Sequence, residues 1–332
     1  MMKTPSFWSQ KNIMGALLVP VSWLWLFGAF LRQKLANTSR SSLPVICIGN
    51  ISVGGTGKTP LTAHLCYLLK ERGYQPAVLT RGYGGKERGP LIVDPSLHDV
   101  ADVGDEPLML SLNELVIVSR DRLRGAYFIQ RSTDANVIIM DDGMQNPRLE
   151  KDMTIGVFDG GTGCGNNRIF PAGPLRQSLA SGLKQLSVAV INGDDETGLM
   201  TKLTDIVPVI SGSLMPDPNT VADIKNKRLV AFAGIGHPTR FFKTVAACGA
   251  NVVQTLAFAD HHPYSNSDLT RLHQDAVQQG AELVTTLKDW MRLPPHWRDR
   301  VNVLPVSMSF SEEADMMLMN MVVDIVELKQ SS

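Results

Sequence analysis

A glycine-rich loop holds the residues best suited to chemistry in this chain of 332 residues. The run Ser52-Val53-Gly54-Gly55-Thr56-Gly57-Lys58-Thr59 fits the phosphate-loop pattern GxxxxGK[ST], except that Ser52 replaces the first glycine. Glycines let backbone N–H groups turn towards a phosphate, Lys58 can reach the β- and γ-phosphate oxygens, and the Thr59 hydroxyl can bind Mg²⁺. The predicted cofactors are ATP and Mg²⁺, and the predicted cofactor-binding residues are Gly54, Gly55, Thr56, Gly57, Lys58 and Thr59.

Two acidic residues that could hold the metal follow an apolar run. Val137–Met140 reads as a buried strand, and Asp141 and Asp142 come directly after it. A phosphate-loop fold needs a carboxylate at the end of a neighbouring strand for its magnesium ion. We expect Asp141 to bind Mg²⁺ directly or through water, and Asp142 to share the task. Taken alone, two adjacent aspartates could also form a simple turn.

Two weaker candidates lie elsewhere in the chain. Asp105 and Glu106 precede Pro107, a pattern that usually marks the start of a helix. His261 lies in the run Asp260–Tyr264 at the end of another expected strand, where a histidine is more often structural than catalytic. By themselves these residues establish no function.

Alternating strands and helices are expected to position these residues. Short apolar runs separated by helical spacing predict a mostly parallel sheet with helices on both faces. The first set of expected strands is Val45–Ile48, Ala77–Leu79, Val116–Val118, Val137–Met140, Ile155–Phe158 and Val188–Ile191. A second, smaller set is Leu229–Ala233, Val252–Phe258, Leu283–Leu287 and Val301–Val306.

The length and the two sets of strands favour two α/β domains. Between them, the Ser, Gly, Pro, Asp and Asn residues around 210–220 resemble a linker. The expected divisions are an N-terminal hydrophobic helix with its flank at 1–40, a phosphate-loop nucleotide- and substrate-binding domain at 41–208, a linker at 209–226 and a smaller α/β domain with His261 at 227–332. The Met-rich helix Glu312–Leu328 falls in the last division, and its methionines are expected to pack in a core.

The segment Ile13–Leu31 is the one compositional anomaly, because Ser22 is its only ordinary polar side chain. As a helix it would be roughly 28 Å long, about the thickness of bilayer hydrocarbon. Trp8, Trp23 and Trp25 lie in or beside it, as interfacial anchors often do. A membrane-inserted or membrane-lying helix is favoured over a core helix or a signal peptide. Spanning and lying flat both stay open, since Pro20 can kink the helix.

Charge and cysteine usage exclude other classes of function. Lys plus Arg equals Asp plus Glu at 32 each, so the sequence lacks the basic excess of a nucleic-acid-binding protein. The cysteines are scattered, with no CxxC pair and no Cys/His cluster, which suits reduced thiols in the cytosol. No nucleic acid and no obligate protein partner is expected.

Six motifs occur in a specific order along nearly the whole chain. They are Gly49–Pro60, Thr80–Gly85, Gly104–Pro107, Asp141–Gln145, Pro171–Arg176 and Asp260-His261. Together they resemble the tetraacyldisaccharide 4'-kinase (lipid A 4'-kinase) family. The resemblance implies two α/β/α (Rossmann-like) domains, the first with a P-loop NTPase-type parallel sheet, joined by a short two-stranded linker, with the active site in the cleft between them.

The resemblance also implies a reaction and its place. The γ-phosphate of ATP would move, with Mg²⁺, to the 4'-hydroxyl of a tetraacyldisaccharide 1-phosphate, an acylated glucosamine disaccharide, giving lipid IVA in lipid A (lipopolysaccharide) biosynthesis. The substrate would lie in the inner membrane, at its cytoplasmic face.

The same resemblance implies roles for individual residues. Asp105 and His261 would be the catalytic pair, and Glu106 would join Asp141 and Asp142 in an acidic metal and nucleotide environment; Arg176 is the candidate for neutralising phosphate charge. Such an aspartate cannot remove a hydroxyl proton early, but it can orient the hydroxyl and accept the proton late. With one member of the pair in each domain, cleft closure would precede reaction.

The chain departs from the family pattern at a few positions. Met144 and Asn146 replace the usual Phe and His of Asp-Asp-Gly-Phe-Gln-His, Gln177 replaces the Glu after the motif arginine, and Leu287 replaces the Glu of Thr-Glu-Lys-Asp. These departures cast doubt on roles for Asn146, Gln177 and Leu287. They leave the phosphate loop, Asp105, Asp141 and His261 unchanged.

Two rival functions stay open. One is a membrane-associated P-loop ATPase switch that phosphorylates no lipid, but its signature lysine before the paired glycines is Val53 here. The other is a lapsed kinase that only binds nucleotide, and the intact Lys58, Thr59, Asp105 and Asp141 argue against it.

Overall fold

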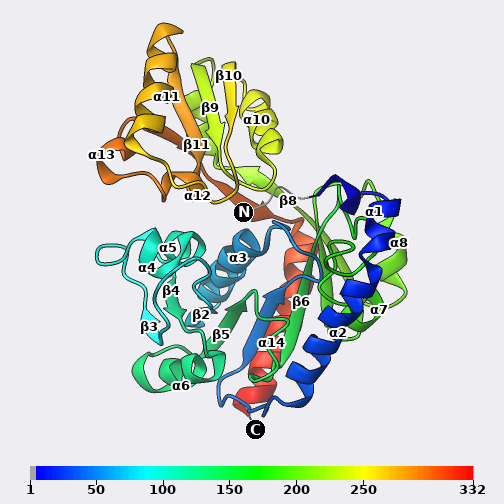
Figure 1. Cartoon of the computed structure of the whole chain (residues 1–332). Coiled ribbons are helices and arrows are strands. Elements are labelled where there is room, and N and C mark those ends of the chain that lie inside the picture. Colours follow the sequence, from blue (N-terminus) through cyan, green and yellow to red (C-terminus); the bar gives the residue numbers. More distant parts are fainter. Residues whose placement is uncertain (1–4, 332) are drawn as a thin grey trace. The chain divides into compact units, whose positions relative to one another are not determined.

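The computed structural model describes residues 5–331, and residues 1–4 of the expected N-terminal segment lie outside this part. The chain forms two compact units (Figure 1). The larger unit comprises residues 5–214 and continues from residue 308 onward, and the smaller unit comprises residues 215–307. The larger unit is therefore discontinuous in sequence.

A mostly parallel sheet forms the centre of the larger unit. Within the described residues it has nine strands in the order β13-β8-β7-β6-β1-β5-β2-β4-β3. The run from β8 to β4 pairs in parallel, and the short β3 pairs antiparallel with β4. The strands are β1 (Val45–Gly49), β2 (Pro76–Thr80), β3 (Leu91–Ile92), β4 (Leu115–Val118), β5 (Val137–Asp141), β6 (Met153–Asp159), β7 (Val188–Asn192), β8 (Val209–Pro216) and β13 (Val306–Ser309).

The position of β1 determines where a ligand can bind. Its five residues are all buried, as expected for a strand covered on both faces. From β1 the chain adds β5, β2 and β4 on one side and β6, β7 and β8 on the other. The strand order thus reverses beside β1, and ligands of such sheets bind at the carboxyl ends of the strands at this point. The glycine-rich loop leaves β1 at that end.

Helices pack on this sheet or lie at its ends. The helix α3 packs on β1, β2 and β5, and α6 packs on β2 and β4 (Figure 1). The helical elements of the larger unit are η1 (Ser6–Trp8), α1 (Ile13–Leu17), α2 (Val19–Lys34), α3 (Lys58–Glu71), α4 (Val100–Val103), α5 (Asp105–Leu110), α6 (Arg122–Ser132), α7 (Leu179–Leu183), α8 (Leu199–Thr204) and α14 (Glu312–Gln330).

The last helix belongs to the larger unit, although the sequence placed it in the second domain. Two ion pairs attach α14 to this unit: His64 Nε2 lies 2.7 Å from Asp315 Oδ1, and Lys329 Nζ lies 2.8 Å from Asp152 Oδ1. Met319 is buried, in agreement with the predicted core packing, whereas Met316 is 54% exposed. A helix that follows the smaller unit in sequence can pack on the larger sheet because β13 returns the chain to that sheet.

The smaller unit is an α/β/α sandwich on a parallel sheet of order β10-β9-β11-β12. Along β9, Val230 and Phe232 pack in one core with α11, and the alternate residues Ala231 and Ala233 pack in a second core with α10. Its elements are α9 (Pro218–Ile224), β9 (Arg228–Ala233), α10 (Pro238–Ala247), β10 (Asn251–Ala257), α11 (Asn266–Gln278), β11 (Glu282–Thr286), α12 (Leu287–Trp290), α13 (Pro295–Arg298) and β12 (Val301–Leu304).

The structure refines two expectations about the connections. Residues 209–226, expected as a linker, contain all of β8 and α9, and the division between the two units, at 214/215, falls within this range. The expected strand Val301–Val306 is two strands, because Pro305 separates β12 in the smaller sheet from β13 in the larger one. Proline has no N–H to donate to a sheet, so it commonly interrupts a strand.

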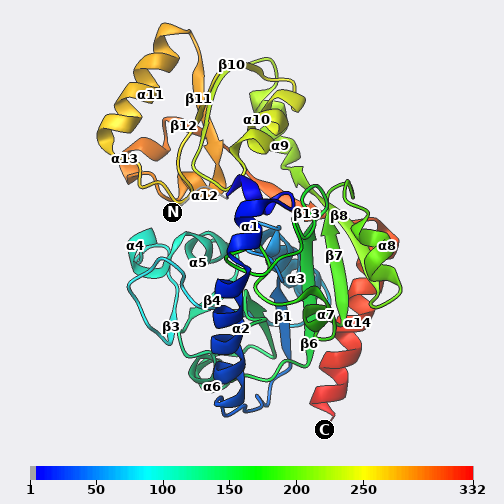
Figure 2. The same cartoon turned by 45° about the vertical axis from the view of Figure 1, so that its right-hand side comes forward.

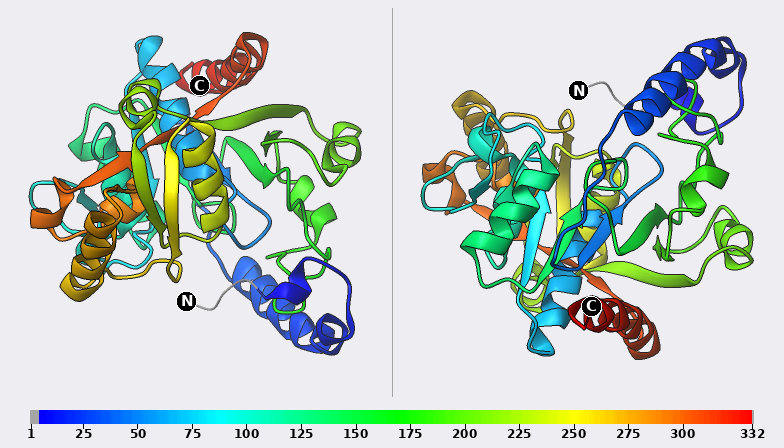
Figure 3. Two further views of the ribbon diagram at one scale, coloured as in Figure 1. Left: turned by 90° about the horizontal axis from the view of Figure 1, so that it is seen from above. Right: turned by 90° about the horizontal axis from the view of Figure 1, so that it is seen from below.

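The apolar N-terminal segment is two helices instead of one. It breaks at Leu18, and Pro20 occupies the first turn of α2, where its missing N–H costs nothing. Figure 3 shows α1 and α2 at the edge of the larger unit, and in Figure 2 α2 runs down the front of this unit. None of the helices within residues 5–331 is long and apolar enough to cross a bilayer.

The exposure along α2 is inverted relative to an ordinary surface helix. Its one buried residue is Ser22, whose Oγ donates to the Ile169 carbonyl oxygen at 2.8 Å. Large apolar side chains face outwards instead: Trp23 is 66% exposed, Leu24 72% and Phe27 61%. Trp8, expected as an interfacial anchor, is buried and donates its indole N–H to the Pro171 carbonyl oxygen.

Candidate active site

The glycine-rich loop connects β1 to α3, and its backbone requires glycine. Gly54 has φ +130° and Gly57, the N-cap of α3, has φ +99°, which lie in the region that side chains disfavour. A Cβ on Gly57 would also lie 2.7 Å from Asn192 Nδ2. The loop ends where α3 begins at Lys58, so the helix N-terminus faces any phosphate bound in the loop.

Two asparagine side chains that the sequence analysis did not single out fix the shape of this loop. Asn50, after β1, donates its amide to the Gly54 carbonyl oxygen and to Thr56 Oγ1, both at 3.4 Å. Asn192, the last residue of β7, donates to the Thr56 carbonyl oxygen at 3.1 Å. The signal that led to Asp141, a polar residue directly after a buried strand, could have found both.

Four of the residues predicted for nucleotide and metal meet beside the loop. Lys58 Nζ lies 3.8 Å from Asp142 Oδ1, and Arg176 Nη1 lies 3.0 Å from the same oxygen. Asp141 precedes Asp142 at the end of β5, which pairs with β1. The lysine of the loop, the paired aspartates and the arginine of the Pro171–Arg176 motif thus form one cluster.

Asp141 is a buried carboxyl in an acidic neighbourhood. It is 2% exposed, and Thr62 Oγ1 donates to its Oδ1 at 3.4 Å. Burial, followed by the nearby charges of Glu106 and Asp142, raises the pKa of Asp141 to about 7, against the lowering effect of Lys58. A cation at this place would relieve the repulsion between these carboxylates.

Asp142 has the opposite electrostatic character. Burial alone would raise its pKa, but the positive charges of Lys58 and Arg176 outweigh burial and lower the pKa below its ordinary value. Its φ of +48° is a left-handed conformation that aspartate tolerates better than most residues. Two adjacent carboxyl groups with pKa values pushed apart are typical of a functional site.

The raised pKa of Asp141 predicts a pH effect on stability. An unfolded aspartate has a pKa of about 4, so this contribution to stability is fully present below pH 4 and is lost as the pH rises through about 7. Asp141→Asn removes the cost of ionising the group. Without metal or nucleotide, the variant should gain stability over the parent by a few kcal/mol between pH 5 and 8, measured by urea unfolding.

Asp195→Asn is the control for that measurement. Backbone N–H groups of Met200 and Leu199 lower the pKa of Asp195 to about 2, so both of its relevant pKa values lie below the tested range. Its stability difference from the parent should stay constant. A difference for Asp141→Asn that is equally constant from pH 5 to 8 would contradict the prediction.

A chain of amides connects Arg176 to the phosphate loop. Arg176 Nη1 donates to Gln145 Oε1 at 2.9 Å, and Gln145 Nε2 donates to the Asn50 carbonyl oxygen at 2.9 Å. The guanidinium is therefore held between the Asp142 carboxylate and the end of β1.

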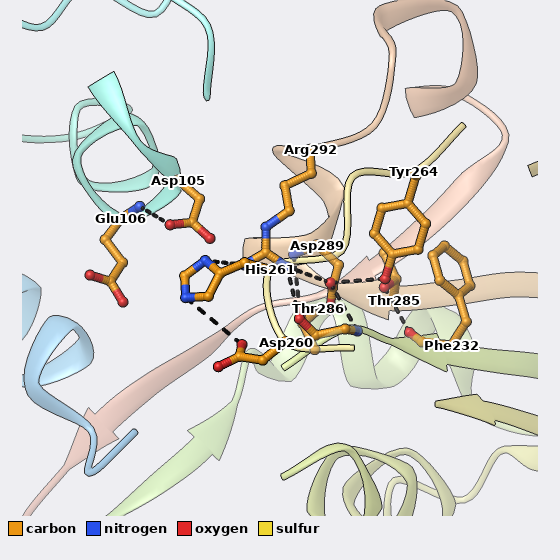
Figure 4. Close-up of polar contacts among 11 residues, drawn as sticks. Asp105, Glu106, Phe232, Asp260, His261, Tyr264, Thr285, Thr286, Asp289 and Arg292 are labelled. Carbon is orange, nitrogen blue, oxygen red and sulfur yellow. Dashed lines mark hydrogen bonds and ion pairs between the residues drawn. The ribbon is translucent and has the colours of Figure 1, made fainter. Parts of the chain in front are cut away.

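Asp105 begins α5 and is 3% exposed (Figure 4). Its Oδ1 accepts a hydrogen bond from the Glu106 backbone N–H at 3.0 Å. Gly104, the N-cap, has φ +92°, and a Cβ there would lie 2.3 Å from the Tyr83 carbonyl oxygen. Glu106 is near enough to raise the pKa of Asp141, which joins α5 to the acidic cluster.

A pocket of about 490 Å³ opens in the larger unit where α2 ends. Four arginines are among its lining residues, Arg32, Arg120, Arg122 and Arg148, together with Asn146. Arg122 is 4% exposed, and its Nη1 donates to the Ser119 carbonyl oxygen, but its buried Nε has no hydrogen-bond partner among the described residues. Burial lowers the pKa of Arg122 to about 10, while Asp141 opposes the shift.

His261 belongs to the smaller unit, in the loop after β10. Its φ is +57°, and its backbone N–H donates to the Gly234 carbonyl oxygen at 3.1 Å. Its Nδ1 lies 3.3 Å from Arg292 Nη2. Asp105 and His261, the expected catalytic pair, thus come from different units.

No group of three or more His, Cys, Asp or Glu residues in the described part of the chain has a metal-binding arrangement. Mg²⁺ in phosphotransferases is commonly held by one or two carboxylates together with the phosphates of the nucleotide. The donor set Thr59, Asp141, Asp142 and Glu106 fits that chemistry, because it supplies oxygens only and includes carboxylates that repel one another.

The fold and this cluster define a class of protein. A phosphate loop after the central strand of a parallel sheet, with a lysine and paired carboxylates beside it, is the site of a P-loop nucleotide-binding phosphotransferase. The family model for tetraacyldisaccharide-1-P 4'-kinase matches residues 14–323, and the chain belongs to this family. The prediction of the family from six motifs is confirmed, as is the prediction of its fold class.

Similar proteins cover nearly the whole chain. Tetraacyldisaccharide 4'-kinase of Rhodospirillum centenum is 42% identical over 94% of each chain. That of Bradyrhizobium sp. is 44% identical over 94% of this chain and 92% of its own length. The crystal structure of the "apo" form of LpxK from Aquifex aeolicus in complex with ATP has a TM-score of 0.74 at 25% identity, covering 95% of this chain and all of the other.

Proposed function

We propose that this chain is a lipid kinase that transfers the γ-phosphate of ATP to the 4'-hydroxyl of a tetraacyldisaccharide 1-phosphate. The product would be lipid IVA in lipid A biosynthesis. The relatives' names support this proposal. The observation that carries it is the presence in one unit of the phosphate-loop cluster, an arginine-lined pocket and an outward-facing apolar helix.

ATP would bind with its phosphates in the loop from Gly54 to Thr59. Lys58 and Arg176 would compensate the negative charge of the phosphates, and both now lie within 4 Å of Asp142. Thr59, Asp141, Asp142 and Glu106 would hold Mg²⁺, which when bound supplies further charge neutralisation. The similar structure of LpxK from Aquifex aeolicus was determined in complex with ATP, which supports ATP as the nucleotide.

Asp105 and His261 would serve the acceptor hydroxyl. The transition state of phosphoryl transfer is loose, so the hydroxyl must be oriented more than it must be deprotonated beforehand. Asp105 would accept a hydrogen bond from the hydroxyl and take its proton late in the reaction. His261 would orient that carboxylate and share the proton.

The lipid end of the proposal rests on the pocket and on α2. The arginines of the pocket suit the phosphate and sugar oxygens of an anionic glycolipid, because guanidinium groups form paired hydrogen bonds with phosphate. Arg32, which lines the pocket, lies on α2. A helix that turns its serine inwards and its Trp, Leu and Phe outwards suits contact with lipid, here the cytoplasmic face of the inner membrane.

Membrane contact through α2 gives a testable expectation. The double variant Leu24→Glu with Phe27→Glu places two charges on the exposed apolar face, where burial of each side chain in lipid is worth about 1.5–3 kcal/mol. Binding to phospholipid vesicles in co-sedimentation should weaken by about a hundredfold. Ile206→Glu, at a 59% exposed site of the same unit, is the control; equal vesicle binding by the double variant and the parent would refute contact through α2.

The function itself is tested by supplying radiolabelled ATP and the tetraacylated disaccharide 1-phosphate to detergent-solubilised protein. Labelled lipid that depends on Mg²⁺ is the expected result. Phosphate release without labelled lipid would instead favour the membrane-associated ATPase switch, especially if nucleotide also made the chain dimerise.

A further inference from the structure

A buried polar network surrounds His261 in the smaller unit (Figure 4). It lies where β9 and β11 end, and its centre is Asp289, a residue of α12 that is 0% exposed. The family resemblance drew attention to this stretch only through the substituted Leu287. The network gives it a physical role.

Asp289 accepts hydrogen bonds from several sides. Its Oδ1 accepts from the Gly234 backbone N–H at 3.0 Å and from the Tyr264 hydroxyl at 2.9 Å. Its Oδ2 accepts from Thr286 Oγ1 at 2.7 Å. Burial and the Asp289 charge raise the pKa of Tyr264, so its hydroxyl keeps the proton that it donates. The carboxylate therefore has a single fixed orientation.

Arg292 is held by this carboxylate. Its Nη1 donates to Asp289 Oδ1 at 3.0 Å and to the Gly234 carbonyl oxygen at 2.8 Å, and its side chain is 4% exposed. The guanidinium is planar, so the two hydrogen bonds that Nη1 donates also fix the position of Nη2. That other nitrogen, Nη2, lies 3.3 Å from His261 Nδ1.

The contact between Arg292 and His261 determines which ring nitrogen carries the proton. A guanidinium has N–H donors only and no acceptor, so Nδ1 must act as the acceptor. In the neutral imidazole the proton then lies on Nε2. The backbone of His261 is also fixed, because it has a left-handed conformation and its N–H donates to the Gly234 carbonyl oxygen.

We propose that Arg292, held by Asp289, is a positioning residue that keeps the proton of neutral His261 on Nε2. The catalytic use of this tautomer rests on the proposed kinase function. Nε2–H can donate to a carboxylate, and the carboxylate of Asp260 is already 3.9 Å from Nε2. With the proton on Nδ1, the ring would offer an acceptor at Nε2 and could not orient a carboxylate.

The tautomer can be measured without substrate. Long-range ¹H–¹⁵N correlation spectra of the full chain with ¹⁵N-labelled histidine distinguish the two ring nitrogens. The chain has seven histidines, so the His261→Gln spectrum identifies the signal of His261 by its loss. At a pH where this signal reports neutral imidazole, we expect the Nε2–H tautomer. A predominant Nδ1–H tautomer in the parent protein overturns the proposal without reference to any variant.

Variants test whether Arg292 is the cause. In Arg292→Gln combined with Asp289→Asn, the buried charges are removed together, so no carboxylate is left unpaired. An amide can donate or accept, and we expect His261 to populate both tautomers. In the kinase assay kcat should fall by about tenfold with KM for ATP unchanged, in the range seen when a supporting partner of a catalytic group is lost.

Two further variants separate positioning from folding. Arg292→Lys keeps a donor-only cation, so it should retain the Nε2–H tautomer and recover part of kcat. Arg298→Gln removes another arginine of the same unit, one that donates to the Leu293 and Met291 carbonyl oxygens and does not contact His261; it should leave the tautomer and kcat unchanged. An unaltered tautomer in the double variant refutes the proposal.

The two proposals fail separately. Absence of labelled lipid with the Nε2–H tautomer present counts against the kinase function alone. An active kinase whose His261 carries its proton on Nδ1 counts against the positioning role of Arg292 alone.

Discussion

Lys58→Met is expected to reduce kcat/KM for ATP by about a hundredfold to a thousandfold, the cost of removing one charged donor from a phosphoryl-transfer site. Methionine keeps much of the apolar stem of lysine and loses the ammonium group. The affinity for ATP and the rate should both fall, because Lys58 would contact the phosphates in the ground state as well as in the transition state. Turnover assays with labelled ATP measure the rate, and titration with nucleotide measures the affinity.

Lys70→Met provides the matched control for this variant. Lys70 lies on the same helix, α3, and its ammonium group pairs with Glu114 at 2.6 Å. Its loss should leave both ATP affinity and rate close to those of the parent. If Lys58→Met turned over lipid at the parental rate, the phosphate loop would not be the site of transfer.

The substitution of Asp105 by Asn should lower kcat by about a hundredfold to ten-thousandfold, the usual contribution of a positioned base. Asparagine keeps the size of the side chain and an oxygen for the Glu106 N–H, which lies 3.0 Å from Asp105 Oδ1 in the parent. The variant therefore removes the charge and the ability to take a proton. KM for ATP should change little, since Asp105 would act on the acceptor.

Two controls accompany that measurement. Asp102→Asn alters another aspartate, three residues earlier, whose Oδ2 accepts from the Asp99 N–H in a helix cap. His261→Ala should resemble Asp105→Asn in lowering kcat, whereas His262→Ala, which loses a contact with Asp268, should not. A selective loss of ATP affinity in Asp105→Asn would assign this residue to nucleotide binding instead.

The sequence predicted those parts of the molecule that depend on local signals. The apolar run before Gly54 and the one before Asp141 are both buried strands, and the order of strand and helix predicted a parallel sheet. Glycines at positive φ in the loop were recognisable from the motif alone. The carboxyl ends of neighbouring parallel strands bring these residues together, and for this reason the nucleotide-binding cluster could be predicted from the sequence.

Contacts between distant residues were not predictable in the same way. Asn192 reaches the loop from a position 136 residues away, and Gln145 reaches Asn50 across 95 residues. The place of Asn192 at the end of a buried strand marks it as a candidate, but nothing in the sequence identifies the loop carbonyl that it contacts. Arg292 and Asp289 were not predicted either, because their role depends on buried contacts around His261 that the sequence does not reveal.

Sequence order predicts that α14 belongs to the second domain, whereas in the structure α14 is part of the larger unit. Its position has a consequence for how the chain matures on the ribosome. Residues 215–307 are contiguous and can fold as soon as they emerge, whereas the nucleotide-binding sheet receives β13 and α14 only after the whole smaller unit has been synthesised. A nascent or prematurely terminated chain would therefore contain a folded smaller unit while β8 still lacked its neighbour β13. In such a chain we expect proteases to cleave the larger unit more readily than the smaller one.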